Sequence, residues 1–492
     1  MEWNKKINVD VKPENTAIQL LNSIQSNHCY KQISEDKMIV MTSHAFLLLP
    51  LLLLLLQVTS VATFQLSFQL PQRSFTVNRL ILYFSPVARR DALAILLTVP
   101  AVMPPLAVAT IEANTLSTTT TTTTASISAS WSATDGLTSH DNTNFVAFDP
   151  SAYKAMKDDP TRTPYFQKAI QQRLGNNPES MIVLDLGTGP YALFAIMAAQ
   201  AGAKAVYAME ADQQAAQSAR TTIAKAGYDD IITVLEGFST NLELPQGVKA
   251  DICIAEIVGS IASEEGAYAT IRDAHQRLVK HPTQPSSWIP NRIQTYAAPA
   301  SYTLHTLFGP PEFDWSKLQG EPVRFNCRDQ GLALLADPVL LEDIAFDTIM
   351  DQNQQTAIKT PKKLHFTIDP ARIEQNTLAF YQEFRRGNSS PADSERLATE
   401  TAHSLSGIAL WPRIFVYDNV VIDSRSYPKG NHQRSHWQTV LPIMSSRPVG
   451  GLYGGETVAI TATLNVPDHG IKAATYQLEG TIEWSPTNNI SL

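Results

Sequence analysis

The sequence is poor in cysteine and in charge. Only 3 of its 492 residues are Cys, and Cys29, Cys253 and Cys327 stand far apart with no CxxC spacing. This excludes a disulfide scaffold and argues against a structural zinc site, so no metal is expected. Charged residues make up 17% of the chain and hydrophobic residues 44%. An apolar fraction of that size excludes a wholly disordered chain.

Acidic residues are absent between Met38 and Arg90, although the whole chain has a net charge of −8. Residues 1–112 hold nine Lys or Arg against seven Asp or Glu, a net charge of +2, so residues 113–492 carry −10. The negative charge of the larger part argues against a nucleic-acid partner and favours a basic one. The front of the chain and the remainder are therefore two different kinds of sequence.

The front of the chain has the features of targeting signals. The apolar run 45–56 is too short for a bilayer, which needs about 20 residues, and has the length of a signal-peptide core. The acid-free composition up to Arg90 is typical of organelle transit peptides. Arg89 and Arg90, followed by the apolar run 92–109, resemble a twin-arginine thylakoid-transfer signal. The alternatives are a single membrane anchor, against which three prolines in the run argue, and a chance arginine pair.

These signals predict a bipartite plastid presequence. We interpret residues 1–37 as a gene-model extension, 38–63 as signal-peptide-like, 64–112 as transit- or thylakoid-transfer-like, and 113–140 as a Thr/Ser linker that cannot bury a core. The expected location is the plastid, either stroma or thylakoid lumen, with no membrane segment in the mature form. If the front is not a presequence, the alternative is the cytoplasm or nucleus. Folding is expected to begin near Asn144.

A β-turn-α-β pattern follows the linker. The buried-strand pattern 182–186 ends at Gly187-Thr188-Gly189, a helix pattern covers 192–202, and a second strand ends at Glu210. This order predicts a doubly wound parallel sheet, whose glycine turn approaches a ligand and whose acid can hold ribose hydroxyls. Both NAD-binding proteins and methyltransferases have this layout. Ala192 in place of a third glycine, and Asp185 before the turn, favour a methyltransferase.

Two glutamates follow another predicted strand of this sheet. Glu256 ends the strand that begins at Asp251, Gly259 follows, and Glu265 lies nine residues after Glu256. A guanidinium is planar with five donors, so two carboxylates can hold it bidentately and orient one nitrogen. Without further context, glutamates at this spacing are also common as surface charges.

The chain resembles the protein arginine N-methyltransferases, which are S-adenosylmethionine-dependent enzymes of class I. The resemblance covers about residues 144–492, and the phrase Glu265-Gly266-Ala267 lies nearest to the type III, monomethylating branch. It is carried by the segment Val183 to Gly189, Glu210, the loop from Glu256 to Glu265, Ser435-His436-Trp437, and the segment from Met156 to Thr163.

The resemblance implies an α/β fold in which a Rossmann-like methyltransferase domain over 141–292 precedes a β-barrel substrate-binding domain over 293–492. It implies methyl transfer from S-adenosyl-L-methionine to a guanidinium nitrogen of an arginine-containing protein. It also allows a homodimer through a helical arm, for which residues 309–320 are a candidate. No nucleic acid is expected as a partner.

The resemblance also implies roles for single residues. In the family pattern Arg162 contacts the carboxylate of S-adenosylmethionine, Glu210 contacts its ribose, and His436 pairs with an acid on the N-terminal helix that matches Asp159 here. The catalytic set is Glu256, Glu265, His436 and Asp159; the cofactor set is Arg162, Asp185, Gly187, Gly189, Glu210, Ser239 and Thr240; Met156 and Trp437 belong to the substrate pocket. Other interpretations remain open: Arg162 as an ion pair with Asp158 or Asp159, His436 as an interior histidine, and Trp437 as core. Glu264 is the neighbour from which Glu265 must be distinguished.

The chain departs from the family pattern at Tyr191. Pro190 and Tyr191 follow Gly189 where the family usually has another glycine, and a phenol there would crowd the cofactor or shift the loop. Two further functions therefore stay open: a catalytically idle relative used for binding, and a methyltransferase that acts on a non-protein substrate.

Overall fold

The computed structural model describes residues 68–70, 73–75, 123–133, 150–175, 177–318, 321–327, 329–426, 435–468 and 473–484. β1 (Phe68–Leu70) and β2 (Arg73–Phe75) pair antiparallel. The signal-like run 45–56, Arg89-Arg90 and the run 92–109 lie outside the described residues. Within the described ranges, no helix combines the length and the apolar character needed to cross a membrane.

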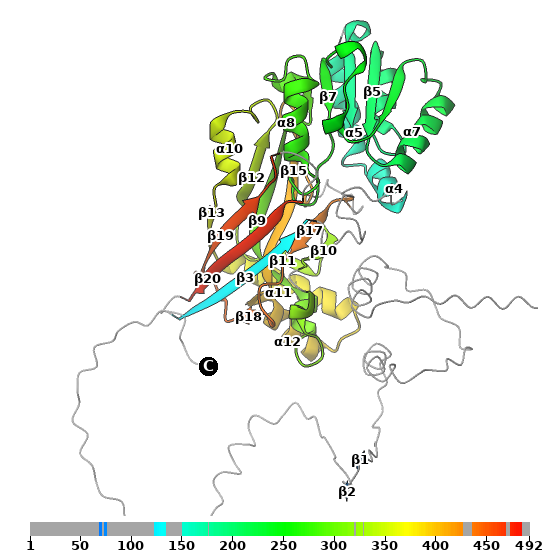
Figure 1. Ribbon diagram of the computed structural model, residues 1–492. Helices are drawn as coiled ribbons and strands as arrows, with labels where there is room; N and C mark the ends of the chain where they lie inside the picture. The colour runs from blue at the N-terminus through cyan, green and yellow to red at the C-terminus, as the bar shows by residue number, and fades with distance from the viewer. Residues whose placement is uncertain are drawn as a thin grey trace, which may run out of the picture. The chain divides into compact units, whose positions relative to one another are not determined.

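A five-stranded parallel sheet forms the first folded part (Figure 1). Its strand order is β6-β5-β4-β7-β8, and helices α4 to α8 accompany it. The central strand β4 therefore has β5 on one side and β7 on the other, which is the switch point where ligands bind in such sheets. The bounds are α4 Pro150–Asp158, α5 Thr163–Leu174, β4 Ile182–Leu186, α6 Leu193–Gln200, β5 Ala205–Glu210, α7 Gln213–Ala226, β6 Ile232–Glu236, β7 Ile252–Ile254, α8 Ala267–Arg277 and β8 Trp288–Ile289.

Local sequence explains where the helices of this part begin and end. The Asp212 side chain accepts a hydrogen bond from the Ala215 amide at 2.7 Å and so caps the first turn of α7. Gly227 ends the same helix with φ of 74°, a conformation that glycine adopts without steric cost.

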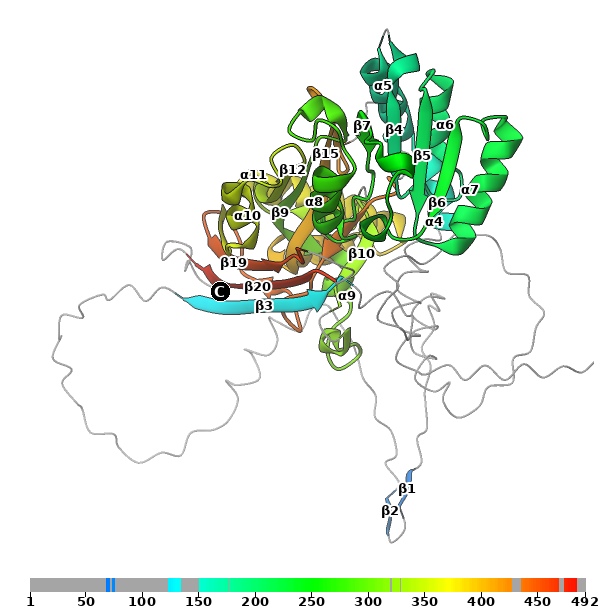
Figure 2. The same cartoon turned by 45° about the horizontal axis from the view of Figure 1, so that its top comes forward.

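The second part consists mainly of antiparallel strands (Figures 1 and 2). A seven-stranded sheet has the order β10-β17-β15-β9-β11, with β12 paired to β9 and β16 to β15, and a four-stranded sheet has the order β13-β19-β20-β3. The strands are β9 Arg292–Tyr302, β10 Val323–Asn326, β11 Leu332–Leu334, β12 Val339–Ala345, β13 Lys362–Thr367, β14 Ser404–Leu405, β15 Gly407–Tyr417, β16 Val420–Asp423, β17 Gln438–Leu441, β18 Val449–Gly450, β19 Thr457–Asn465 and β20 Thr475–Glu483.

The predicted fold class is confirmed: a Rossmann-like sheet is followed by a β-barrel domain. Helices α9 (Thr303–Leu307), α10 (Gln352–Lys359), α11 (Pro370–Arg386) and α12 (Pro391–Ala402) lie between strands of the second part. The candidate arm 309–320 contains the short 3-10 turn Trp315–Leu318, and its role in a dimer stays a prediction. Apart from the linker over 113–140, the residue boundaries proposed for the domains also stay predictions.

The interpretation of residues 113–140 as a linker is wrong for β3, Thr124–Ser132. This strand pairs with β20 over nine residues, from Thr124 opposite Glu483 to Ser132 opposite Thr475. Ile127 and Trp131 are buried, and the Trp131 ring stacks on Tyr476 with centroids 5.2 Å apart. Strand pairing uses backbone groups, so a Thr/Ser-rich segment can join a sheet when its few large apolar residues share one face.

We predict that Trp131→Ala lowers the free energy of unfolding by about 3 kcal/mol, because it removes a buried aromatic ring. Urea unfolding followed by circular dichroism measures the change. Ser130→Ala is the matched control, since Ser130 is an exposed neighbour in the same strand. Equal stability of the two variants would show that β3 does not pack in the folded protein.

Candidate active site

The glycine turn after β4 is held from inside by Asp185. The amides of Gly187 and Thr188 both donate to the carbonyl of Met209, at 2.9 and 3.0 Å. The buried Asp185 carboxylate accepts from Thr188 Oγ1 at 2.6 Å and from the Ala195 amide at 3.1 Å. Burial raises the pKa of Asp185 to about 6 against these hydrogen bonds. Asp185 thus orders the turn, while a direct contact with a cofactor stays a prediction.

Glu210 connects the end of β5 to the same turn. Its Oε2 accepts from the Gly189 amide at 2.8 Å and its Oε1 from the Asp212 amide at 2.9 Å. Burial raises the pKa of Glu210. Each carboxylate oxygen has two acceptor positions, so this side chain retains capacity for ligand hydroxyls.

Helix α4 covers the glycine turn. A Cβ at Gly189 would lie 3.1 Å from Cε1 of Tyr153, and Gly189 has φ of 66°, so both space and backbone favour glycine there. Burial and the charges of Glu210 and Glu265 raise the pKa of Tyr153. The half-buried Tyr191 has Lys157 Nζ of α4 4.8 Å from its ring centroid. Tyr191 therefore interacts with the helix that covers the turn.

Arg162 binds Glu256 rather than Asp158 or Asp159. Arg162 Nε donates to Glu256 Oε2 at 2.7 Å, and Nη2 donates to the same oxygen. Nη1 donates to the carbonyl of Met156 at 3.3 Å. The two side chains are only 7% and 4% exposed. Glu256, which the sequence predicted to bind a substrate guanidinium, therefore already binds the guanidinium of Arg162 in the same chain.

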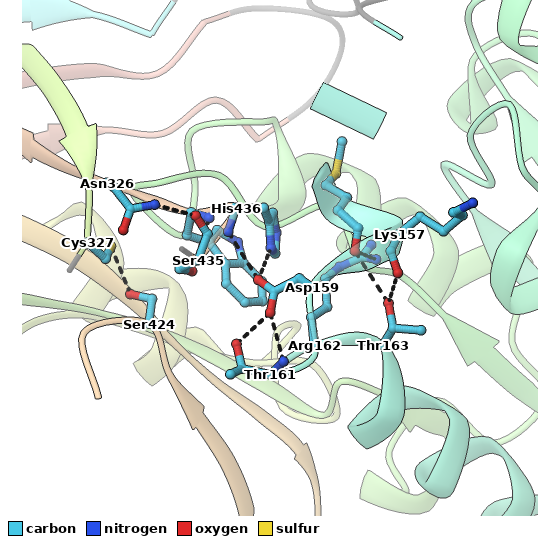
Figure 3. A network of polar contacts seen from close by, with 12 residues as sticks. Lys157, Asp159, Thr161, Arg162, Thr163, Asn326, Cys327, Ser424, Ser435 and His436 are labelled. Atoms are coloured by element: carbon cyan, nitrogen blue, oxygen red, sulfur yellow. Dashed lines mark hydrogen bonds and ion pairs between the residues drawn. The ribbon is translucent and has the colours of Figure 1, made fainter. Parts of the chain in front are cut away.

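Asp159 and His436 form a hydrogen-bonded pair (Figure 3). His436 Nδ1 lies 2.8 Å from Asp159 Oδ2, and the His436 amide donates to the same oxygen at 3.0 Å. The amide and hydroxyl of Thr161 donate to Oδ1 at 2.8 and 2.7 Å. Burial alone would raise the pKa of Asp159, but the hydrogen bonds from His436 and Thr161 outweigh it and lower that pKa.

The ionised state of Asp159 determines the tautomer of His436. A carboxylate can only accept, so Nδ1 carries the proton and Nε2 is an acceptor. Burial lowers the pKa of His436 and keeps the ring neutral, although Asp159 opposes this shift. The pair predicted from the sequence is thus in contact, with Nε2 available as a base.

The loop after Glu256 buries Glu264 rather than Glu265. Arg324 of β10 donates Nη1 to Glu264 at 3.1 Å, and its Nη2 also bonds that carboxylate. A Cβ at Gly259 would lie 2.8 Å from the Glu264 Cβ, so the glycine permits this packing. Glu265 is the exposed residue of the two. Desolvation of its carboxyl group by neighbouring protein atoms, with the charges of Glu256 and Glu264, raises the pKa of Glu265 to about 7.

Barrel side chains anchor this loop. Trp437 is buried, and its Nε1 donates to the carbonyl of Val258 at 3.0 Å. The Ser263 hydroxyl lies 3.0 Å from the hydroxyl of Tyr476, and its amide donates to Glu342 at 3.3 Å. Sequence reasoning missed the set Arg324, Ser263, Glu342 and Tyr476, because these residues stand in ordinary strand or loop patterns that carry no chemical motif.

The remaining predicted residues are Ser239, Thr240 and Met156. Ser239 and Thr240 belong to the 3-10 turn Ser239–Asn241, which follows β6 at the carboxyl edge of the sheet, and the Ser239 carbonyl accepts from Arg277 at 2.9 Å. The carbonyl of Met156 accepts from Arg162 and from Thr163 Oγ1.

We predict that His436 contributes a loss of unfolding free energy as pH drops below about 6.5, because the unfolded chain protonates His436 while the folded chain resists it. Asp185 and Glu265, whose pKa values are raised in the folded chain, contribute in the opposite direction, so the effect of His436 is the difference between wild type and variant. His436→Gln should make the slope of unfolding free energy against pH less positive than in the wild type. Urea unfolding at pH 7.5, 6.5 and 5.5 measures the slope. His281→Gln, which changes an exposed histidine, should leave the slope as it is. An unchanged slope in His436→Gln contradicts a buried neutral ring.

The chain is similar to known methyltransferases. The family model for ribosomal protein L11 methyltransferase matches residues 165–267. The chain is 30% identical over 203 residues to protein arginine N-methyltransferase PRMT10 of Arabidopsis thaliana, covering 40% of this chain and 51% of that protein. It is 30% identical over 200 residues to protein arginine N-methyltransferase 7 of Gallus gallus, covering 39% of this chain and 27% of that protein.

The match spans about half the length of the Arabidopsis relative and a smaller share of the Gallus one. The crystal structure of Arabidopsis thaliana protein arginine methyltransferase 10 aligns over 68% of this chain and 98% of its own, with 17% identity and a TM-score of 0.46. The predicted resemblance is confirmed: this chain is similar to the protein arginine N-methyltransferases, within the class I S-adenosylmethionine-dependent methyltransferases.

Proposed function

We propose that the chain is an S-adenosyl-L-methionine-dependent protein arginine N-methyltransferase. One observation carries the proposal. At the carboxyl edge of the sheet, Glu256 binds the guanidinium of Arg162 through two nitrogens. Both charges influence the nearby His436, since Arg162 lowers and Glu256 raises its pKa. A guanidinium-binding carboxylate and a neutral histidine base beside a glycine turn match the needs of arginine methylation.

The residues present fit S-adenosylmethionine. This molecule has a carboxylate, a ribose and an adenine, and when bound it supplies a methyl group activated by a positively charged sulfur. Gly187 and Gly189 both have positive φ and leave the turn without side chains. Arg162 would hold the carboxylate and Glu210 the ribose hydroxyls, with Asp185 ordering the turn. Ser239 and Thr240 would lie at the adenine.

Arg162 stands between two carboxylates in this proposal. When its guanidinium engages the carboxylate of the methyl donor, its hold on Glu256 weakens. Glu256 then accepts hydrogen bonds from the substrate guanidinium, and Glu265 supplies the second carboxylate. Because the pKa of Glu265 is about 7 in the folded chain, an arriving cation stabilises its ionised form. The two carboxylates draw positive charge toward the nitrogens they bind and leave the third nitrogen more nucleophilic.

The proton balance assigns the last role to His436. The lone pair of the substrate nitrogen would form the new carbon–nitrogen bond as the methyl–sulfur bond breaks and its electron pair stays on the sulfur as a neutral thioether, and that nitrogen then loses a proton. Nε2 of His436 accepts it, since Nδ1 is held by Asp159. Trp437, whose ring centroid lies 3.7 Å from that of His436, and Met156 would limit the room at the substrate. The number of methyl groups transferred follows from that room.

We predict that Glu256→Gln and Glu265→Gln each lower methyl transfer to an arginine peptide by about 100-fold or more, because a neutral amide cannot hold or polarise the guanidinium. Radiolabel transfer from S-adenosylmethionine to a Gly-Arg peptide measures the rate. Exposed Glu243→Gln is the control for a charge change outside the cluster.

The same assay, together with calorimetry, separates the alternatives. Label transfer that persists in both glutamine variants contradicts the double-glutamate mechanism. Transfer to free arginine but not to the peptide indicates a non-protein substrate. Failure of the wild-type chain to bind S-adenosylmethionine in calorimetry indicates a catalytically idle relative, for which Tyr191 would be the first residue to replace with glycine.

We also propose that the front of the chain directs it to a plastid, on the basis of its acid-free stretch and paired arginines. A fusion of residues 38–112 to a fluorescent protein should accumulate in plastids, and Arg89→Lys with Arg90→Lys should block transfer into the thylakoid lumen. Diffuse cytosolic fluorescence of the unchanged fusion refutes the plastid assignment.

A further inference from the structure

A groove lies between helices α11 and α12, away from the residues of the candidate active site. The two helices pack against each other (Figure 1), and Tyr453 of the loop 452–456 also lines the groove. The groove has a volume of about 670 Å³. Its floor is apolar, with buried Ile373 and Ala398.

The groove combines aromatic rings with carboxylates. Glu374 and Tyr381 line it from α11, Glu395 from α12, and Tyr453 from the loop. Leu378 and Tyr453 are 61% and 58% exposed, which is unusual for such large apolar surfaces. A cation can interact favourably with both the face of a tyrosine ring and a carboxylate.

Tyr453 is held in place although it is exposed. The fully buried Glu456 accepts from the amides of Tyr453 and Gly454 at 3.1 and 2.8 Å. His403 Nδ1 donates to the carbonyl of Leu452 at 2.8 Å, and the His403 and Tyr453 ring centroids are 4.8 Å apart. A Cβ at Gly454 would lie 2.6 Å from Pro370 Cβ, so the loop rests on the start of α11. The exposed ring is therefore presented by a fixed support.

The negative charge of the groove is not neutralised by the helices that form it. Three of the four arginines of α11 and α12 pair with carboxylates: Arg372 with Asp337, Arg386 with Glu383, and Arg396 with Glu400. Arg385 donates to the Ser389 carbonyl and does not line the groove. Among the described residues, Glu374 and Glu395 have no ion-pair partner. Two free carboxylates in one aromatic groove favour a cationic ligand.

We propose that this groove binds arginine side chains of a peptide. The planar guanidinium stacks on Tyr453 or Tyr381 and donates to Glu374 and Glu395, while the aliphatic stem covers Leu378. A lysine ammonium lacks the planar stack and binds more weakly. If the chain methylates proteins, which is the proposed function, the groove docks arginine-rich segments at a distance from the reacting arginine.

The test uses the full-length chain with Glu256→Gln and Glu265→Gln, so that the active site does not contribute to binding. Calorimetry with a twelve-residue Gly-Arg repeat peptide gives Kd. Adding Glu374→Gln and Glu395→Gln together should weaken Kd about tenfold, and Tyr453→Ala about three- to fivefold. Glu400→Gln on α12 and Tyr165→Ala, which changes another exposed tyrosine, are matched controls and should leave Kd within twofold.

The ligand chemistry is tested with two further peptides. Citrulline in place of arginine keeps the shape without the charge and should abolish binding, and a Gly-Lys repeat should bind several-fold more weakly. No binding of the Gly-Arg peptide, or equal Kd values for groove and control variants, overturns the proposal. If the groove binds the peptide but the wild-type chain transfers no methyl group, the proposed function is wrong. The assignment of the groove as an arginine-binding site would still hold.

Discussion

The contact between Arg162 and Glu256 is the interaction on which the site depends. Arg162 and Glu256 are both buried, and their mutual attraction offsets the free energy that each charge loses by leaving water. Each side chain therefore holds the other in position. Arg162 lies at the start of α5, and Glu256 follows β7. The ion pair therefore links the helical N-terminal segment to the carboxyl edge of the parallel sheet, and removal of either partner would leave an uncompensated charge beside His436.

The barrel domain completes a site that the parallel sheet only begins. His436, in the segment before β17, donates a hydrogen bond to Asp159. The indole of Trp437 donates to the carbonyl of Val258. Arg324 of β10 donates to the carboxylate of Glu264. Each of these bonds joins the first part of the chain to the second. A small displacement of the barrel would therefore alter the positions of His436, of Trp437 and of the loop between the two glutamates at once.

The sequence predicted the parallel sheet well because its strands are continuous apolar runs that end at glycine or an acid. It also predicted that Asp159 and His436 would meet, since that pairing came with the family resemblance. Three features lay beyond it. The choice between Glu264 and Glu265 as the buried acid depends on Arg324, a residue with no motif of its own. The ion pair between Arg162 and Glu256 depends on how α4 and α5 fold. The strand β3 was not predicted, because its sequence is mostly serine, threonine and alanine, and only Ile127 and Trp131 show the apolar spacing of a strand.

The position of β3 constrains how the protein matures. β3 precedes the entire parallel-sheet domain, while its partner β20 follows it, so the four-stranded sheet stays incomplete until segments from both sides of that domain meet. Pairings between such distant segments form late, since the loop they close is long. Until then the edge of β20 that pairs with β3 has no hydrogen-bonded partner strand. Any proteolytic removal of a leader must also cut before Thr124, because a cut further along would take a strand from the finished fold.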